Sequence, residues 1–321
     1  MPSNDIFVFS EKAGLLAELI AGGRALAEQR GGQVVAICLG TRAQAEQAGQ
    51  RGADAMLWLG ELPPDRLVDD YLATLAGLVE QQSPDLLLIG ATRRGRALAG
   101  RLAARLGVTA LSDVLAFSVE GEHVHIRHLI FGGGAVRVEK ALAGPVIATV
   151  GPGVYQPLPA ETGRGGTVSE AVPFIAPAWQ AKLRQRKTRA AVTVNLGAAR
   201  RVVCPGRGLA KQSDLALVEE LALALKAELA CTRPLAEGLG WLPRERYIGI
   251  SGATLHADLY LGVGVSGQVQ HLIGMSATRV VVAINKDQNA PIFAHADYGI
   301  VGDLYAVVPA LIQAIKARSV G

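Results

Sequence analysis

Short apolar runs alternate with helical patterns in two separate blocks of the chain, and this alternation limits the fold more than any other feature. The first block has apolar runs at residues 6–9, 34–40, 55–60 and 86–91, and helical spacing at 13–30, 42–51, 65–82 and 95–106. Strands that alternate with helices form parallel sheets through right-handed crossovers. The first block therefore predicts an α/β fold.

A second block of the same kind begins near residue 201. Its strand-like runs are residues 201–206, 227–233, 247–252, 258–265, 279–287 and 298–303, and its helical patterns are 215–229 and 304–318. About six strands joined in this way predict a doubly wound, Rossmann-like domain. Ligands of such domains bind outside the carboxyl ends of the strands.

The stretch between the two blocks has a different pattern. Strand-like runs follow one another closely from residue 107 to 150 with glycine-rich breaks, which predicts antiparallel hairpins. Prolines and glycines then interrupt residues 151–196, as in a linker or an extended wrapping segment. We therefore expect an α/β domain over 1–150 with a parallel sheet plus antiparallel hairpins, a linker over 151–196, and the doubly wound domain over 197–321.

Composition excludes several classes of function. The formal net charge of +4 suits an anionic ligand or acidic partner but does not predict nucleic-acid binding. The chain has no apolar run of about 18 residues, so no membrane span is expected. Its N-terminus lacks the pattern of a secretory signal. The three cysteines lie far apart in apolar surroundings, as in a reducing compartment, and the expected location is the cytoplasm.

Three histidines, His123, His125 and His128, lie close together in one of the hairpin strands. Because side chains alternate along a strand, His123 and His125 share one face while His128 lies on the other. The sequence offers no obvious fourth ligand. We therefore expect no metal site here.

Polar residues gather at the predicted strand ends of the second block. They are Arg207, Thr232, Arg233, Ser251, Ser266, Asn285 and Asp303. The carboxyl ends of parallel strands meet at one edge, so these side chains are expected to line one cleft. The set has donors but no nucleophile with its base, no carboxylate pair and no metal ligands. This pattern predicts no catalytic residue and favours a cofactor that carries the chemistry itself.

A second interpretation comes from the glycines of residues 258–271, DLYLGVGVSGQVQH. Gly262, Gly264 and Gly267 have the G-x-G-x-x-G spacing of a dinucleotide-binding turn, and Asp287 follows twenty residues later. A chain with 38 glycines meets such a spacing easily by chance. An NAD(P)-dependent dehydrogenase would also need His271 as its acid and base, without an orienting carboxylate. A third hypothesis, a non-redox nucleotide-binding or scaffold module, fits the N-terminal half considered alone.

Several long stretches resemble the alpha (large) subunit of electron-transfer flavoproteins. They are GRGL at 206–209, TRP at 232–234, WLPRERYIGISG at 241–252, DLYLGVGVSGQVQH at 258–271, VVAINKDQNAPIF at 281–293 and ADYGIVGDLYAVVPAL at 296–311. The N-terminal half is similar more loosely, through FVFSE, ATRRGRALA at 91–99 and the hairpin at 131–138. The details are most similar to the branch with members linked to carnitine metabolism and nitrogen fixation.

The resemblance implies that the C-terminal domain binds FAD. Arg233 matches an arginine set over the flavin, where its charge favours the reduced, anionic form. His271 matches a histidine near the flavin O2 edge, and the two together are expected to stabilise charge there. Ser251 and Thr232 stand where the family has other hydroxyl residues, Ser251 near flavin N5.

Other positions are implied along the rest of the cofactor. Arg207 matches an arginine near the phosphates, while Asn285 and Asp303 match residues that hold the adenosine end. The whole set implied for FAD is Arg207, Thr232, Arg233, Ile248, Gly249, Ile250, Ser251, Ser266, Gly267, Gln268, Val269, Gln270, His271, Asn285, Asp303 and Leu304. Ile250 and Ala253 depart from the Gln and Lys of the broad family, so the flavin potential is expected to differ.

The function that the resemblance implies is that of an electron carrier, not an enzyme. It would form a heterodimer with a smaller beta subunit, which holds AMP or a second FAD. Electrons would come from a flavin dehydrogenase of the acyl-CoA dehydrogenase type and pass to a quinone oxidoreductase or another acceptor. An electron-bifurcating member of the same family is the alternative, and it would require the second FAD.

Overall fold

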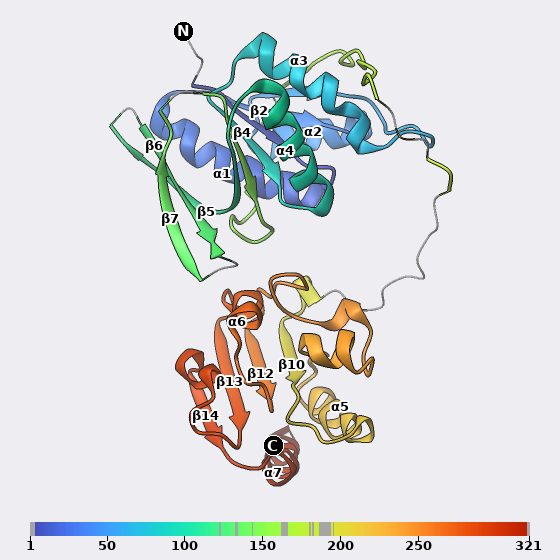
Figure 1. Ribbon diagram of the computed structural model, residues 1–321, viewed down its shortest axis with the longest axis vertical. Coiled ribbons are helices and arrows are strands. Elements are labelled where there is room, and N and C mark those ends of the chain that lie inside the picture. Colours follow the sequence, from blue (N-terminus) through green and yellow to red (C-terminus); the bar gives the residue numbers. More distant parts are fainter. Residues whose placement is uncertain are drawn as a thin grey trace. The chain divides into compact units, whose positions relative to one another are not determined.

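The computed structural model describes residues 4–319, except 122, 132–133, 143, 162–165, 180, 182, 186–193 and 195. The described chain forms two compact units, one before and one after residues 186–193. Each unit is a sheet with helices packed against it (Figure 1). The predicted α/β class with two domains is confirmed.

The first unit is built on a nine-stranded sheet of order β7-β6-β5-β8-β4-β1-β2-β3-β9. Its strands are β1 (Ile6–Phe9), β2 (Val34–Cys38), β3 (Ala55–Trp58), β4 (Leu86–Gly90), β5 (Ala110–Glu120), β6 (His123–Ile130), β7 (Ala135–Lys140), β8 (Val146–Val150) and β9 (Thr167–Val168). Its helices are α1 (Ala13–Arg30), α2 (Arg42–Gln50), α3 (Leu72–Gln82) and α4 (Arg93–Leu106).

The strand pairing of this unit agrees with the sequence except at β8. Strands β1 to β4 are parallel, and β5, β6 and β7 form the predicted antiparallel hairpins. β8 was expected to join those hairpins, but it pairs in parallel with both β4 and β5. An almost wholly buried apolar strand fits the middle of a parallel sheet covered on both faces.

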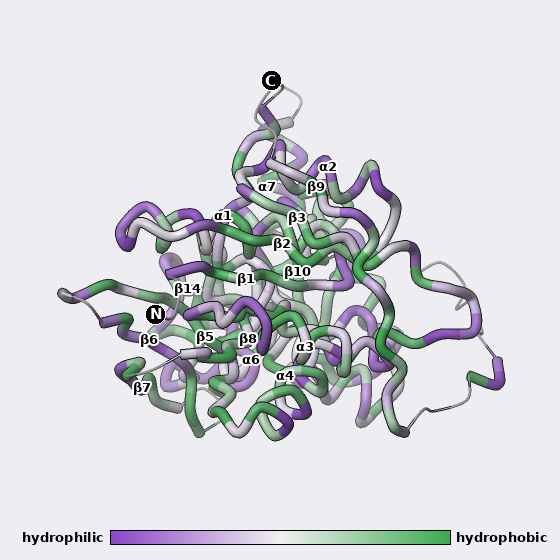
Figure 2. Tube along the Cα trace, turned by 90° about the horizontal axis from the view of Figure 1, so that it is seen from above, coloured by the Kyte–Doolittle hydropathy of each residue, from purple (hydrophilic) through white to green (hydrophobic). Residues whose placement is uncertain are grey.

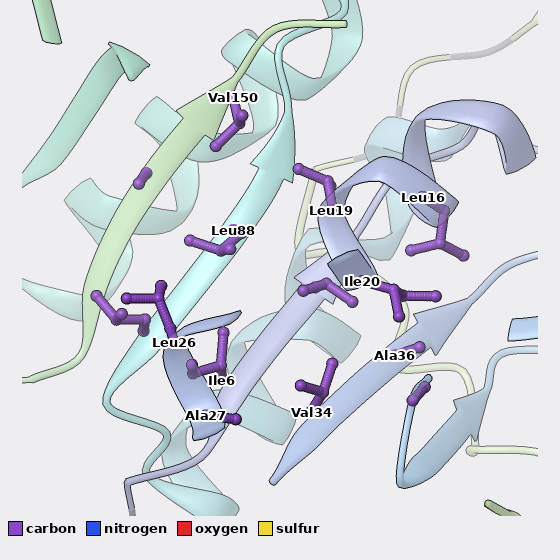
Figure 3. Packing of buried hydrophobic residues seen from close by; sticks show 14 of the residues in the cluster. Ile6, Leu16, Leu19, Ile20, Leu26, Ala27, Val34, Ala36, Leu88 and Val150 are labelled. Atoms are coloured by element: carbon purple, nitrogen blue, oxygen red, sulfur yellow. The ribbon is translucent and has the colours of Figure 1, made fainter. Parts of the chain in front are cut away.

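Apolar side chains fill both sides of the sheet in the first unit. Figure 3 shows Leu19 and Leu26 of α1 packed over Ile6, Val34 and Leu88 of neighbouring strands. All five side chains are buried. Figure 2 shows that the residues of β1 and β2 are hydrophobic along the chain trace. Within the stretch predicted as a linker, β9 adds a short parallel strand beside β3.

The second unit has a five-stranded parallel sheet of order β11-β10-β12-β13-β14. Its strands are β10 (Arg201–Pro205), β11 (Glu228–Leu229), β12 (Leu259–Val263), β13 (Val280–Asn285) and β14 (Tyr298–Val301), and its helices are α5 (Leu215–Ala224), α6 (Val269–Met275) and α7 (Leu304–Ser319). Numbered from β10, this order is 2-1-3-4-5, that of a doubly wound fold. The order reverses between β10 and β12, which makes that point the expected ligand site.

Two predicted elements of the second unit are wrong. Residues 247–252 were expected to form a strand but form a turn with two isolated bridges. The Tyr247 ring lies against Gly252, and its hydroxyl donates to the Ser251 carbonyl, so the chain folds back on itself. The helix predicted over 215–229 ends at Ala224, because Lys226 turns into the left-handed region at φ 50° before β11.

Candidate functional site

A cavity of about 500 Å³ opens at the carboxyl edge of the second sheet. Its lining residues are Arg207, Gly208, Thr232, Arg233, Pro234, Tyr247, Ile248, Gly249, Ile250, Ser251, Gly264, Val265, Ser266, Gly267, Gln268, Gln270, His271 and Asn285. They follow β10, β11 and β12, end β13, or belong to the turn at 247–251. The cavity lies where the strand order reverses, and its volume is typical of ligand and cofactor pockets.

The cavity brings together every predicted site residue except Val269, Asp303 and Leu304. Val269 begins α6 and is half exposed outside the lining. Asp303 accepts a hydrogen bond from the Tyr305 backbone N–H at 3.0 Å, at the start of α7. Leu304 is buried in the core under the sheet. These three positions lie outside the cavity lining in this structure.

Five lining residues were missed by the sequence reasoning. They are Gly208, Pro234, Tyr247, Gly264 and Val265. Four of them are adjacent in sequence to a predicted residue, and Gly264 lies two positions from one. Tyr247 was assigned to a strand, and the turn that replaces this strand brings the residue to the cavity.

Glycines allow two loops to meet at the floor of the cavity. The Gly208 N–H donates to the Gly264 carbonyl at 3.0 Å, joining the segments that follow β10 and β12. A Cβ atom added at Gly208 would lie 2.6 Å from the Gly264 Cα atom. Real Cβ atoms do not approach backbone so closely, so this contact needs glycine.

Thr232 has a buried hydroxyl without a partner among the described residues. The residue is 8% exposed, and its backbone N–H donates to the Pro205 carbonyl at 3.1 Å. Buried polar groups are nearly always hydrogen-bonded, and an exception requires an explanation. Because Thr232 lines the cavity, a ligand acceptor or donor at this wall would satisfy the hydroxyl.

The charged groups of the cavity wall are guanidinium groups. Arg233 Nε donates to Glu237 Oε2 at 2.5 Å, and Arg244 contacts the other oxygen of Glu237 at 2.9 Å. This hydrogen bond raises the pKa of Arg233 and lowers the pKa of Glu237. Arg207 has no carboxylate partner within the described part of the chain. No Asp or Glu is among the described lining residues, so the wall suits an anionic ligand.

His271 is buried and uncharged at neutral pH. Its Nε2 lies 2.8 Å from the Tyr260 hydroxyl and its Nδ1 lies 3.2 Å from the Ile248 carbonyl oxygen. Burial lowers the pKa of His271 to about 4, although the hydrogen bond to Ile248 opposes this shift. The expectation that His271 stabilises negative charge is therefore limited at neutral pH to hydrogen bonding, and the positive charge comes from the arginines.

Asn285 connects the ends of β12 and β13. Its Nδ2 donates to the Val265 carbonyl at 2.8 Å, and its Oδ1 accepts from the Asp287 N–H at 3.0 Å. Asp287 Oδ1 in turn accepts from the Asn289 N–H at 2.9 Å, and Asp287 is not among the lining residues. The dinucleotide interpretation therefore lacks its acidic residue at the cavity.

The three histidines of β6 lie as the strand alternation predicts. His128 is buried, while His123 and His125 lie on the other face. His128 Nε2 is 3.1 Å from Glu139 Oε1, and its Nδ1 is 3.3 Å from the Ser112 carbonyl oxygen. The described residues contain no group of three or more His, Cys, Asp or Glu side chains that could hold a metal ion.

A switch-point cavity with arginines and hydroxyls defines a nucleotide-cofactor-binding α/β unit joined to a second α/β unit. Family models agree with this class. Residues 13–173 match the electron transfer flavoprotein domain, and residues 195–276 match the electron transfer flavoprotein FAD-binding domain. The second match indicates flavin binding by the unit that contains the cavity.

Curated relatives match the chain over almost its full length. A protein of Escherichia coli strain K12 named "Putative electron transfer flavoprotein subunit YdiR" is 43% identical, covering 98% of each chain. Protein FixB of Escherichia coli O139:H28 is 39% identical, covering 97% of this chain and 98% of its own. The chain therefore belongs to the electron transfer flavoprotein family, among its alpha-type subunits, and the predicted resemblance is confirmed.

None of the helices in the described ranges combines the length and the apolar character needed to cross a bilayer.

Proposed function

We propose that this chain is an electron carrier subunit that holds FAD in the cavity of its second unit. The single observation that carries the proposal is the orphaned Thr232 hydroxyl, buried in a cavity wall with arginines and without carboxylates. The phosphates of a nucleotide cofactor would pair with the arginines, and one of its many polar ring atoms would pair with the hydroxyl. The family membership supports the same ligand.

The cavity residues divide into two kinds of contact with FAD. Arg207, exposed beside the tight Gly208 turn, would bind the pyrophosphate. Arg233, anchored by Glu237, would lie with Ser251 at the flavin ring, and Ile250 would cover part of the ring with apolar surface. Bound FAD would supply the electron-accepting ring, which none of the described lining residues offers. The side chains orient the cofactor and set the local charge.

The partners follow from the carrier role. A smaller beta subunit would complete a heterodimer and hold AMP or a second FAD. A flavin dehydrogenase of the acyl-CoA dehydrogenase type would deliver electrons, and a quinone oxidoreductase or another acceptor would receive them. Electron bifurcation is the second candidate, and flavin counting distinguishes the two roles. One FAD with one AMP per heterodimer fits a simple carrier, whereas two FADs fit bifurcation.

Replacing Thr232 with valine tests the site with two effects of opposite sign. Valine keeps the shape of threonine but removes the unpaired hydroxyl, whose burial costs about 1–3 kcal/mol. The variant without flavin is therefore expected to be at least as stable as the parent chain. Its dissociation constant for FAD should rise by roughly threefold to tenfold, the value of one net hydrogen bond. Urea unfolding and FAD titration measure the two quantities.

Thr232→Ser is the matched control, because it retains the hydroxyl and should retain the affinity for FAD. Equal FAD affinity of the valine variant and the parent chain would contradict the assignment of Thr232 to the cofactor.

A further inference from the structure

Both ring nitrogens of His271 are occupied by the protein itself. The Ile248 carbonyl lies 3.2 Å from Nδ1, and the Tyr260 hydroxyl lies 2.8 Å from Nε2. His271 and Tyr260 are buried, and His271 lines the cavity. The tyrosine is on β12, eleven residues before the histidine on α6, so the pair joins the central strand to the cavity wall.

The two partners determine which nitrogen carries the proton. A carbonyl oxygen only accepts hydrogen bonds, so Nδ1 must be the protonated nitrogen. In a neutral imidazole Nε2 is then an acceptor, and the Tyr260 hydroxyl must donate to it. A second proton on Nε2 would force the hydroxyl to turn and accept, since a hydroxyl can donate or accept. Protonation of the ring therefore requires this hydrogen bond to reverse.

The surroundings hold the tyrosine in this donor role. Burial raises the pKa of Tyr260 well above its ordinary value. Burial likewise raises the pKa of the neighbouring Cys204 thiol on β10. Neither group ionises near neutral pH, so both keep their protons. A Cβ atom at Gly262 would lie 3.1 Å from the Tyr260 hydroxyl and 3.0 Å from Cε1, so glycine at this strand position leaves room for the ring.

We propose that Tyr260 is a positioning residue of the cavity, which holds His271 as a neutral imidazole with its proton on Nδ1. The inference rests on the proposed function, because it assigns this neutral wall to the flavin site. Among the described lining residues, the positive charge offered to bound FAD then comes from the arginines. Gly262, which has a dinucleotide-like spacing to Gly264 and Gly267, acts through Tyr260 instead of through a phosphate.

Nitrogen NMR of the full chain with ¹⁵N-labelled histidine tests the proposal. Substitution His271→Gln identifies the signals of His271 among the six histidines. The parent chain should show a protonated Nδ1 and an unprotonated Nε2 from about pH 5.5 to pH 8. Tyr260→Phe should lose this fixed pattern, either by mixing the two tautomers or by taking up a second proton at a higher pH than the parent chain.

Two further variants keep the test decisive. Gly262→Ala should move the His271 signals in the same direction as Tyr260→Phe, because the added Cβ presses on the tyrosine. Tyr71→Phe, which alters a buried tyrosine of the first unit, should leave them unchanged. A parent chain with its proton on Nε2, with a His271 that titrates near its ordinary pKa, or with the same spectrum as Tyr260→Phe would overturn the proposal.

The NMR test can succeed or fail independently of the proposed function, because the tautomer of His271 is measured without flavin. In the FAD-loaded protein, the flavin midpoint potential of Tyr260→Phe should gain a pH-dependent step where His271 titrates. The parent protein should lack this step. A chain that binds no FAD but shows the expected tautomer would reject the proposed function and keep the role of Tyr260.

Discussion

Substitution of Gly267 by alanine is expected to destabilise the second unit by roughly 3 kcal/mol and to abolish stable FAD retention. Gly267 has φ 84°, a left-handed conformation that is costly for a residue with a side chain. Its Cβ atom would also lie 2.3 Å from the Ile292 backbone nitrogen. Since backbone cannot move aside like a flexible side chain, the loop after β12 must shift away from the cavity.

The effect of Gly267→Ala is measured by urea unfolding followed through hydrogen exchange in peptides of β12 and β13. Gly238→Ala is the control, because a Cβ atom there meets nothing within 4 Å and its φ is not positive. That variant should stay within about 1 kcal/mol of the parent chain. Equal stabilities of the two variants would show that the loop does not depend on glycine at 267.

Lowering the pH from 6.5 to 4 is expected to cost the second unit about 3 kcal/mol of stability through His271 alone. The pKa of this histidine is about 4 in the folded chain, against an ordinary value of 6.5. Between these values the unfolded chain binds more protons, so the free energy of unfolding rises with pH. The contribution is complete above about pH 6.5 and is lost toward pH 4, at about 1.4 kcal/mol per pH unit.

Substitution His271→Gln removes this titration, so the stability of the variant should depend less steeply on pH between 4 and 6.5. The difference appears in urea midpoints measured at several pH values in that range. His295→Gln, at an exposed histidine in the same unit, should keep the slope of the parent chain. If parent and His271→Gln lose stability in parallel, His271 titrates at its ordinary pKa and is not desolvated as the structure indicates.

Much of the architecture could be predicted from the alternation of apolar runs and helical spacing. The first strand and first helix begin and end where the pattern places them, at Ile6–Phe9 and Ala13–Arg30. The errors arise where tertiary contacts override local pattern. Val146–Val150 follows two hairpins in sequence but inserts beside β4, where a buried apolar strand has partners on both sides.

The candidate site was likewise predicted only in part from local sequence pattern. Polar residues at the strand ends predicted the cleft, since parallel strands end at one edge. Residues 247–252 were expected to form a strand because their apolar pattern is typical of one. The contact of Tyr247 with Gly252 shows that they form a turn. The contact between Tyr260 and His271 joins residues on two different elements, so no local pattern contains it.

The cofactor content of the chain copurified with its partner tests the central claim most directly. We expect a flavin absorbance spectrum, and release of FAD from the chain in a ratio of about one to one. Loss of this flavin in Gly267→Ala but not in Gly238→Ala would locate it in the cavity of the second unit. A complex that carries no flavin, and that cannot be reconstituted with added FAD, would contradict the account.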